Sequence, residues 1–515
     1  MISNGTVLVT GVTGSIGSWV TRKFLDNGWK VIALVRGDSP SAAAARAHRA
    51  LEIAGAADLA NQMKVIHANI CHEDLCKHLT AGCREVSLVV HCAGVLEFGP
   101  EFAELNHRVN VEGTANLLAL SETLSVPFCH FSTAYVAGKR LGRVFEDELD
   151  TGQEFHNAYE SSKAQAEKLV HDWTHRTGLR SFIFRPSIVV GDSAEGRIAN
   201  FDGLYNFMRL LDSIAGVIGN APFRVAANPL ATKNLVPVDY VADAAWHILM
   251  TDSGGTYHLT NPAPTSLSAL RDIFAELFAI PGARLVDEEE FRAARASKLE
   301  LMYRRAADLY TPYLQVEPQF DRTHADAALD GASAAILPMD AAFFRILLDY
   351  ARSVDWGRTR LDSRHKTQEA RPASGARRSE SGVLGLVEVE RYFSSFLADK
   401  MHRQLLPNLK NLSATCRIVV QDVDAPSCCR AWSLRIDQGR LERISQNGED
   451  CQCMFSLASD TFASIVGGEQ TPQQAFFQRN VNIEGDMETG LKLATVLAAF
   501  FRKWPYKPQL DHVLP

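Results

Sequence analysis

The segment Thr10-Gly11-Val12-Thr13-Gly14-Ser15-Ile16-Gly17 constrains this chain most strongly. It follows Thr6-Val7-Leu8-Val9, a β-branched apolar run that predicts a buried strand, and it precedes residues 18–25, whose apolar spacing predicts a helix. Glycines between a strand and a helix let the backbone approach a pyrophosphate, and the helix N-terminus offers free N–H groups. The segment therefore predicts a dinucleotide site that includes Gly11, Thr13, Gly14, Ser15, Ile16 and Gly17.

Size and charge narrow the class of protein. At 515 residues the chain predicts two or three domains, and its net charge of −7 argues against a nucleic-acid partner. Neither a signal peptide nor an apolar run long enough for a transmembrane segment is visible, which predicts a cytoplasmic protein. The ten cysteines lack the paired spacing of a zinc site, so we expect reduced thiols and no metal.

The end of the second predicted strand indicates the type of cofactor. Residues 31–35 form an apolar run that ends at Arg36. A carboxylate at this position would accept from a free ribose 2′-hydroxyl, whereas a guanidinium pairs with a 2′-phosphate. Arg36 therefore predicts NADP (NADPH). Arg46 and Arg49 on the following helix either add to this charge or form a solvated helix face.

Two more predicted strands should border the cofactor. The strand over residues 65–70 ends beside the adenine, where Asn69 and Ile70 would lie. The strand over residues 87–94 has small residues where it passes under the cofactor, namely Cys92, Ala93 and Gly94. Asn110 opens the next helix, which it either caps or ties to the active-site strand.

Three residues form a candidate catalytic set. Ligands of parallel α/β sheets bind at the carboxyl ends of strands, which places Ser132 and Thr133, after the strand 128–131, near a substrate carbonyl. Tyr159 and Lys163 share one face of a predicted helix over residues 157–168. An ammonium beside a phenol favours the phenolate and makes the phenol a better acid and base near neutral pH. A surface Tyr–Lys pair is the alternative, which Thr133 and the glycine segment disfavour.

These residues together resemble the extended short-chain dehydrogenase/reductase (SDR) superfamily. Thr10–Gly17 resembles its T-G-x-x-G-x-x-G loop, and Thr133, Tyr159 and Lys163 match its Ser/Thr-Tyr-Lys centre. The resemblance implies a Rossmann-type doubly wound parallel sheet, with Lys163 on the nicotinamide ribose and Tyr159 beside the cofactor.

Within that superfamily, several segments resemble the thioester reductase and fatty acyl reductase branch, over roughly residues 5–355. The segments are 34–36, 131–136, 157–164, 184–191, 201–205 and 234–243. The branch implies that Pro186 and Ile188 run past the nicotinamide. Two departures are Ser15-Ile16 in place of the usual Phe-Leu and Asn69 where Asp is usual.

The resemblance implies that residues 1–355 form a reductase domain. Its NADP-binding core covers about 1–192 and 234–260, and a helical substrate region covers about 193–233 and 261–355. The large apolar residues of the substrate region either line an acyl tunnel or pack its core: Phe201, Tyr205, Phe207, Met208, Leu301, Met302, Tyr303, Phe343 and Phe344.

The remainder of the chain divides into a linker and a second domain. Residues 356–384 are rich in Arg, Ser, Gly and Pro, which predicts a flexible linker whose positive charge either meets an acidic carrier protein or is simply solvated. Residues 385–510 resemble an α+β SCP2 (sterol carrier protein 2) domain, in the helix with Asp460-Thr461-Phe462 and Gly467, the turn 472–477, and the segment 481–486 before an amphipathic helix 491–501. Such domains bind lipids or acyl chains.

The combined expectation is an NADPH-dependent oxidoreductase of an acyl thioester, bound to coenzyme A or to an acyl carrier protein, or of a related lipid-like carbonyl substrate. Three alternatives remain open. They are a hydroxysteroid dehydrogenase, a sugar-nucleotide epimerase-like SDR, and a lipid-transfer protein whose reductase fold only binds NADP.

Overall fold

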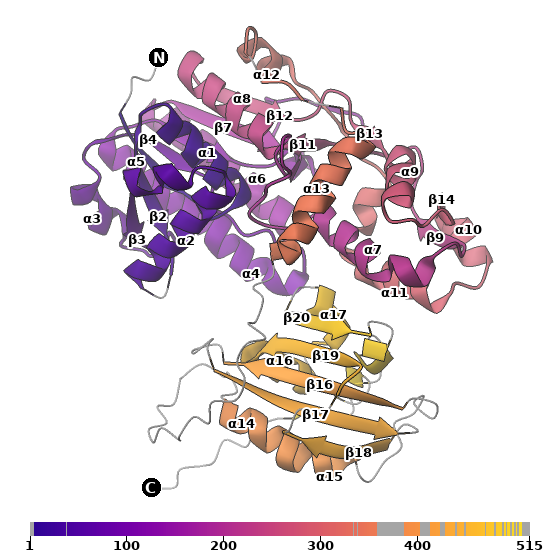
Figure 1. Ribbon diagram of the computed structural model, residues 1–515. Coiled ribbons are helices and arrows are strands. Elements are labelled where there is room, and N and C mark those ends of the chain that lie inside the picture. The colour runs from indigo at the N-terminus through magenta and orange to yellow at the C-terminus, as the bar shows by residue number, and fades with distance from the viewer. Residues whose placement is uncertain are drawn as a thin grey trace, which may run out of the picture. The chain divides into compact units, whose positions relative to one another are not determined.

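The computed structural model describes residues 5–357, apart from 38, 333 and 337, and parts of 386–506, and the chain divides into two units, Met1–Ser363 and Arg364–Pro515 (Figure 1). In the second unit the description omits residues 402–412, 423–427, 438–439, 447–449, 469, 478–479, 487–488, 491, 495–496, 499–500 and 502–503.

A seven-stranded sheet forms the centre of the first unit. All neighbouring strands are parallel, in the order β3-β2-β1-β4-β5-β7-β12, so the order of strands reverses between β1 and β4. Ligands of such sheets bind at this reversal, outside the carboxyl ends of the strands. The strands are β1 Thr6–Thr10, β2 Lys30–Val35, β3 Met63–His67, β4 Val86–His91, β5 Phe128–Phe131, β7 Ser181–Pro186 and β12 Gly255–Leu259.

Helices cover both faces of this sheet. Successive side chains of a strand point to opposite faces of the sheet. Val7 and Val9 of β1 therefore pack in the core formed with α1 and α8, whereas Leu8 packs in the core formed with α5 and α6. Both faces of β1 are therefore apolar, as is typical of a doubly wound parallel sheet. The helices of this part are α1 Ser15–Asp26, α2 Pro40–Ile53, α3 Leu75–Leu79, α4 Ala103–Asn106, α5 Gly113–Leu124, α6 Ala158–Thr177 and α8 Val238–Thr251.

Local signals set the bounds of α6. Asn157 is the N-cap, and its side chain accepts from the N–H of Glu160, while Gly178 ends the helix in the left-handed region with φ 68°. The segment that opens at Asn110 differs from the expected α-helix, because residues His107–Glu112 form a π-helical turn ahead of α5. The third strand also ends earlier than expected, at His67, so that Asn69 and Ile70 lie in the turn after it.

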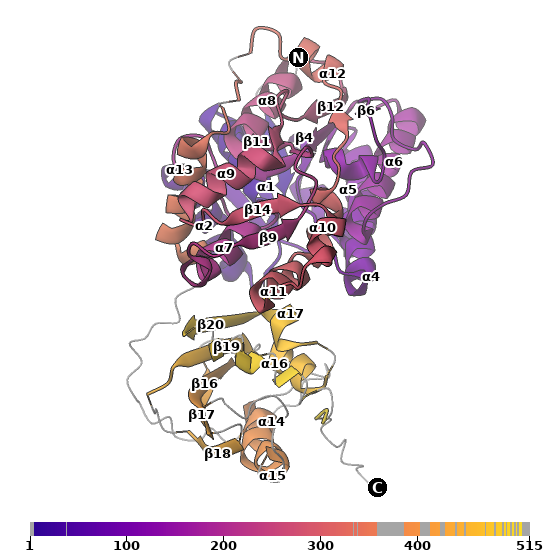
Figure 2. The same cartoon turned by 90° about the vertical axis from the view of Figure 1, so that its right-hand side faces the viewer.

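The substrate region is helical, as predicted, but it also contains strands that we did not predict. β9 Phe223–Ala226 and β14 Ala283–Val286 pair in parallel, and Figure 2 shows them next to α7 and α9. The helices are α7 Leu204–Ile218, α9 Leu267–Leu277, α10 Glu288–Ala293, α11 Lys298–Ala306, α12 Thr323–Ala328 and α13 Ala341–Ser353; the short strands are β6 Arg143–Val144, β8 Ile188–Val190, β10 Thr232–Lys233, β11 Leu235–Pro237, β13 Thr265–Ser266 and β15 Gln319–Phe320.

The second unit contains a five-stranded mixed sheet in the order β18-β17-β16-β19-β20. Its strands are β16 Ala414–Gln421, β17 Cys429–Asp437, β18 Arg440–Ser445, β19 Cys453–Ala458 and β20 Val481–Gly485; its helices are α14 Leu386–Arg391, α15 Ala398–Met401, α16 Ser459–Val466 and α17 Pro472–Phe477. Alternate residues of β16 are buried, so one face of the sheet packs against the core. In the predicted helix 491–501, Leu493, Ala494, Leu497 and Phe501 are buried, whereas positions 491, 496 and 500 lie outside the described residues.

The predicted linker lies almost wholly outside the described residues, which stop at Gly357 and resume at Leu386. Its first residue differs from the expectation. Trp356 is buried, and its ring lies 6.2 Å from that of Phe201, so this residue packs with the first unit.

Candidate active site

The glycine loop forms a cradle at the carboxyl end of β1. A β-carbon on Gly11, whose φ is +74°, would lie 2.4 Å from the amide nitrogen of Ala93, and one on Gly17 would lie 2.1 Å from the carbonyl oxygen of Gly11. α1 begins at Ser15 without a side-chain cap and without an acidic residue in its first turn. The backbone approach and the uncapped N–H groups fit a pyrophosphate, so the residues present fit a dinucleotide.

The predicted adenosine residues lie at the ends of β2 and β3. Arg36 is exposed, and the Arg46 guanidinium donates to its carbonyl oxygen at 2.7 Å, so both cations reach the carboxyl end of β2. The side-chain oxygen of Asn69 accepts from the N–H of Cys71 at 3.0 Å and closes a turn. Ile70 is buried. The turn after β3 is therefore fixed by its own side chain, and contacts of Asn69 with adenine stay a prediction.

A hydrogen-bond chain joins β1 to β4 under this cradle. The N–H of Ala93 donates to Thr10 Oγ1 at 3.3 Å, and Thr10 Oγ1 donates to His91 Nδ1 at 2.7 Å. Thr114 Oγ1 donates to the carbonyl oxygen of Asn110, so it accepts from His91 Nε2 at 3.0 Å, which fixes the neutral tautomer of that ring. Burial lowers the pKa of His91 to about 3, so the chain keeps this polarity at neutral pH.

Thr133, Tyr159 and Lys163 come together at one cavity, as predicted. Burial raises the pKa of Tyr159 to about 12, and a hydrogen bond with Thr133 opposes this shift. Lys163 Nζ donates to the carbonyl oxygen of Phe131 at 2.6 Å, and burial lowers the pKa of Lys163 to about 8. We expected the ammonium to control the phenol. In this structure burial dominates instead, and the phenol keeps its proton at neutral pH.

Asn110 ties the π-helical turn to the catalytic helix. Its Nδ2 donates to Ser162 Oγ at 2.9 Å and to the carbonyl oxygen of Val95 at 3.0 Å, while its Oδ1 accepts from the N–H of Val95 at 2.8 Å. Ser162 Oγ in turn donates to the carbonyl oxygen of Tyr159 at 2.9 Å. The side chain therefore ties elements together, but its partners lie on α6 and at Val95 rather than on the strand that precedes Ser132 and Thr133.

The candidate catalytic residues and the glycine loop line the same cavity, of about 400 Å³. Gly14, Ser15, Ile16, Gly17, Cys92, Gly94, Pro186 and Ile188, all predicted to contact the cofactor, also line it, whereas Gly11, Thr13 and Ala93 lie outside this lining. The hydroxyls of Ser132 and Ser187 are buried in it without a hydrogen-bond partner among the described residues. A buried hydroxyl without a partner is costly, so these two groups indicate a polar ligand beside Pro186 and Ile188.

A series of ring contacts leads from Tyr159 into the substrate region. The ring of Phe98 lies 5.9 Å from that of Tyr159 and 5.3 Å from that of Tyr310. Tyr310 contacts Phe207 at 5.1 Å, and the series continues through Tyr303 to Phe223 on β9. We call this series the aromatic wall. It gives the cavity one continuous apolar side from the catalytic phenol to the small sheet.

The far part of the cavity, which we call the distal lobe, is lined by α7, α9, β9, β14 and α11. Its residues are Leu204, Phe207, Leu211, Phe223, Val225, Ala227, Leu267, Leu270, Arg271, Phe274, Ala275, Ile280, Ala283, Leu285 and Tyr303. Of the nine large residues named from sequence, Phe207 and Tyr303 line the lobe, whereas Phe201, Tyr205, Met208, Phe343 and Phe344 are buried in packing outside it. Leu301 is exposed, and the side chain of Met302 lies outside the described residues.

Sequence reasoning missed several residues of the site. The ring of Phe98 contacts Tyr159, Tyr310 and Tyr313. Tyr135 donates to the buried carboxylate of Glu317 at 2.6 Å. The helical spacing of Tyr310 and Tyr313 was a usable signal. Phe98 and Glu317 follow from no local pattern, because tertiary packing alone brings them to Tyr159 and Tyr135.

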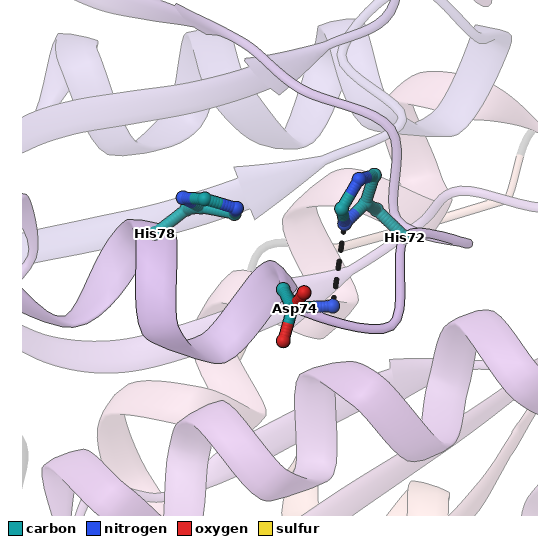
Figure 3. A group of neighbouring side chains, drawn as sticks. All are labelled: His72, Asp74 and His78. Atoms are coloured by element: carbon teal, nitrogen blue, oxygen red, sulfur yellow. Dashed lines mark hydrogen bonds between the residues drawn. The ribbon is translucent and has the colours of Figure 1, made fainter.

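One group of side chains resembles a metal site. His72, Asp74 and His78 place their candidate ligand atoms within 4.8 Å of one another (Figure 3). However, His72 Nδ1 accepts from the N–H of Asp74 at 3.2 Å, and Asp74 Oδ1 pairs with Lys77 Nζ at 2.6 Å. These contacts already engage one ligand atom each of His72 and Asp74, both histidines are exposed, and we assign no metal to this group.

Comparison with known families and structures agrees with the two units. Residues 9–245 match the family described as male sterility protein, and residues 394–498 match the SCP-2 sterol transfer family. A crystal structure of the terminal R domain from the myxalamid PKS-NRPS biosynthetic pathway is similar with a TM-score of 0.58 and 25% identity, and the match covers 69% of this chain and 92% of that domain.

Curated relatives match the first unit. The isonitrile lipopeptide synthase of Streptomyces coeruleorubidus is 29% identical over 281 residues, which are 52% of this chain and 18% of the synthase. The carboxylic acid reductase of Mycobacterium marinum is 26% identical over 287 residues, 50% of this chain and 24% of the reductase. The chain thus spans less than a third of the length of these relatives. Among the described helices, none is both long and apolar enough to cross a bilayer.

Proposed function

We propose that this chain, whose residues 9–245 match the male sterility protein family and whose residues 394–498 match the SCP-2 sterol transfer family, is an oxidoreductase. It uses NADPH to reduce an acyl thioester, or a related lipid-like carbonyl compound, to an aldehyde or alcohol. The observation that carries the proposal is the single cavity that joins the glycine loop, the catalytic residues and the apolar distal lobe. The similarity to reductases of carrier-bound pathways supports a thioester held by coenzyme A or a carrier protein.

The cofactor would be held by residues at the switch between β1 and β4. The glycine loop would receive the pyrophosphate, Arg36 and Arg46 the 2′-phosphate, and Lys163 the nicotinamide ribose. Asn69 and Ile70 would border the adenine, and Cys92, Ala93 and Gly94 would pass under the nucleotide. Pro186 and Ile188 would border the nicotinamide. When bound, NADPH supplies a hydride to the carbonyl carbon.

The chain's own residues would stabilise the negative charge that forms on the carbonyl oxygen and then protonate it. The hydroxyls of Thr133 and Tyr159 would hold this oxygen, and a well-placed donor lowers such a barrier by roughly 2–4 kcal/mol. Tyr159 then gives its proton to the oxygen, which yields a hemithioacetal. Loss of the C–S bond releases the thiol, which takes the hydroxyl proton, and leaves an aldehyde. The raised pKa of Tyr159, about 12, suits this direction, because the phenol stays protonated until negative charge forms beside it.

NADPH oxidation tests the proposal directly. Purified full-length protein is mixed with NADPH and an acyl-coenzyme A or an acyl-loaded carrier protein, and absorbance, free thiol and aldehyde are followed. We expect one NADPH to be lost per thiol released where the aldehyde accumulates, and two where the aldehyde is reduced further to the alcohol. Tyr159→Phe should lower kcat by roughly 10²–10⁴-fold and leave NADPH binding intact. Tyr350→Phe is the matched control, because Tyr350 lies on α13 outside the cavity lining.

Two results would contradict the proposal. One is Tyr159→Phe with the turnover of the unmodified protein. The other is NADPH formation from steroid alcohols without thiol release, which would support a hydroxysteroid dehydrogenase instead.

A further inference from the structure

The residues that line the distal lobe are apolar, apart from one arginine. On β9, Phe223 and Val225 face the lobe at the two-residue period of a strand. On α9, the lining residues Leu267, Leu270, Arg271, Phe274 and Ala275 share one helix face. Among the lobe residues named above, Arg271 is the one charged side chain; the other charged residues that line the cavity are Lys163, Asp202 and Lys233. A cation on an otherwise apolar face requires an explanation, because it carries a desolvation cost.

The contacts of Arg271 leave part of its guanidinium without a partner. Its Nε is buried and has no hydrogen-bond partner among the described residues. Its terminal nitrogen lies 3.0 Å from the carboxylate of Asp272, the next residue in the chain, in a pair whose side chains are 36% and 66% exposed. Exposed pairs of this kind contribute little to stability, so Asp272 holds the guanidinium weakly. A ligand in the lobe can therefore compete for it and satisfy the buried Nε.

We propose that Arg271 binds an anionic oxygen of the molecule that occupies the distal lobe. The planar guanidinium donates two parallel hydrogen bonds to a carboxylate or a phosphate, which suits such a group better than a neutral acyl chain. The inference rests on the proposed function, because that function makes the lobe part of the substrate site. It adds that the substrate is an amphipathic thioester, one of whose anionic groups reaches the distal lobe.

Two parts of a thioester can supply this oxygen. One is a carboxylate at the distal end of the acyl group. The other is the phosphate on the pantetheine arm of coenzyme A or of a carrier protein. Both have the same chemistry at Arg271, so the experiment must vary the two ends of the substrate separately.

Four thioesters separate these sources. They carry either a dodecanoyl group or the same group with a terminal carboxylate, and each acyl group is attached either to coenzyme A or to N-acetylcysteamine, which has no phosphate. Dissociation constants are measured by calorimetry on the full chain without NADPH, and kcat/KM is measured with it. The variants are Arg271→Met, which keeps a flexible stem without charge, Arg271→Lys, which keeps charge without the fork, and Arg345→Met as control. Arg345 is an exposed cation paired with Glu276 on the surface and outside the cavity lining.

We expect Arg271→Met to weaken binding and lower kcat/KM by about 10- to 100-fold for one class of anionic thioester only, with Arg271→Lys intermediate and Arg345→Met unchanged. A loss confined to the carboxylated acyl groups assigns the acyl end, and a loss confined to the coenzyme A thioesters assigns the phosphate. Equal effects on all four thioesters, or none, would overturn the inference. Failure of the wild-type chain to oxidise NADPH with any of them would count against the proposed function alone, because the dissociation constants still decide the role of Arg271.

Discussion

The ammonium of Lys163 on α6 donates to the carbonyl oxygen of Phe131 at the end of β5, at 2.6 Å. Its nitrogen also lies 3.4 Å from His130 Nε2, and burial lowers the pKa of that histidine, so the imidazole stays neutral beside the cation. Lys163 is therefore fixed by two acceptors of the sheet while its own pKa falls to about 8. Two consequences of this environment can be measured, one in activity and one in stability.

The activity should decline on the alkaline side of neutrality. Lys163 binds and orients as an ammonium, which is the populated form below its pKa of about 8 and is lost as the pH rises through that value. We expect kcat/KM, which reports the free enzyme, to fall tenfold per pH unit well above pH 8. Lys163→Met should show a much lower rate without this alkaline limb. A profile that stays level to pH 10 would contradict the prediction.

Lys163 should also lower the free energy of unfolding, because its ammonium is buried. Its pKa in the folded chain lies below the ordinary 10.5, so at pH 7 the unfolded chain holds the proton more favourably, and the free energy of unfolding rises with pH between about 8 and 10.5. We expect Lys163→Met to raise the free energy of unfolding by about 1–3 kcal/mol at pH 7 and by less at pH 10. Chemical denaturation at both pH values measures this. Lys168→Met, at an exposed position on the same helix, should leave the stability nearly unchanged at both pH values.

The cations at the end of β2 should select the cofactor. If Arg36 pairs with a 2′-phosphate, Arg36→Ala will weaken NADPH binding by about 10- to 100-fold and leave NADH binding unchanged. Titration of the protein with each nucleotide, followed by fluorescence, measures both constants. Arg49→Ala is the control, because Arg49 is an exposed cation on the same helix as Arg46. Equal weakening of NADPH and NADH would mean that Arg36 does not recognise the phosphate.

The glycine cradle should not tolerate a methyl group at its closest point. A β-carbon on Gly17 would lie 2.1 Å from the carbonyl oxygen of Gly11, so Gly17→Ala must displace the loop. We expect nucleotide binding to weaken at least tenfold and the melting temperature to fall. A β-carbon on Gly82 meets nothing within 4 Å, and Gly82→Ala should leave both quantities unchanged. Normal nucleotide binding by Gly17→Ala would show that this close approach does not shape the site.

The sequence was most informative where the constraint is local. The run Thr6–Thr10, the glycines after it, and the Tyr159–Lys163 spacing on a helix capped by Asn157 are short-range patterns, and each has its expected place. The parallel pairing of β9 with β14 could not be predicted this way, because its residues are far apart in the chain and β9 is only a four-residue strand. For the same reason, no local sequence pattern identified Phe98 or Arg271 as residues that line the cavity.

The pKa values and hydrogen-bond partners of the site residues could not be predicted from the sequence pattern either. Tyr159 and Lys163 both line the cavity, but their spacing could not reveal that Lys163 donates to the carbonyl oxygen of Phe131. The pKa of Tyr159 depends on how completely the surrounding elements bury it, which is a property of the folded chain.

The protonation state of the Cys92 thiol affects how the cavity can treat a bound thioester. Its thiol borders the cavity, and burial raises its pKa well above the ordinary value, so the sulfur carries its proton at physiological pH. A thiolate next to a bound thioester would exchange partners with it and trap the acyl chain on the protein. A protonated sulfur prevents that self-acylation. It also makes the cavity resistant to alkylating inhibitors that depend on an ionised cysteine.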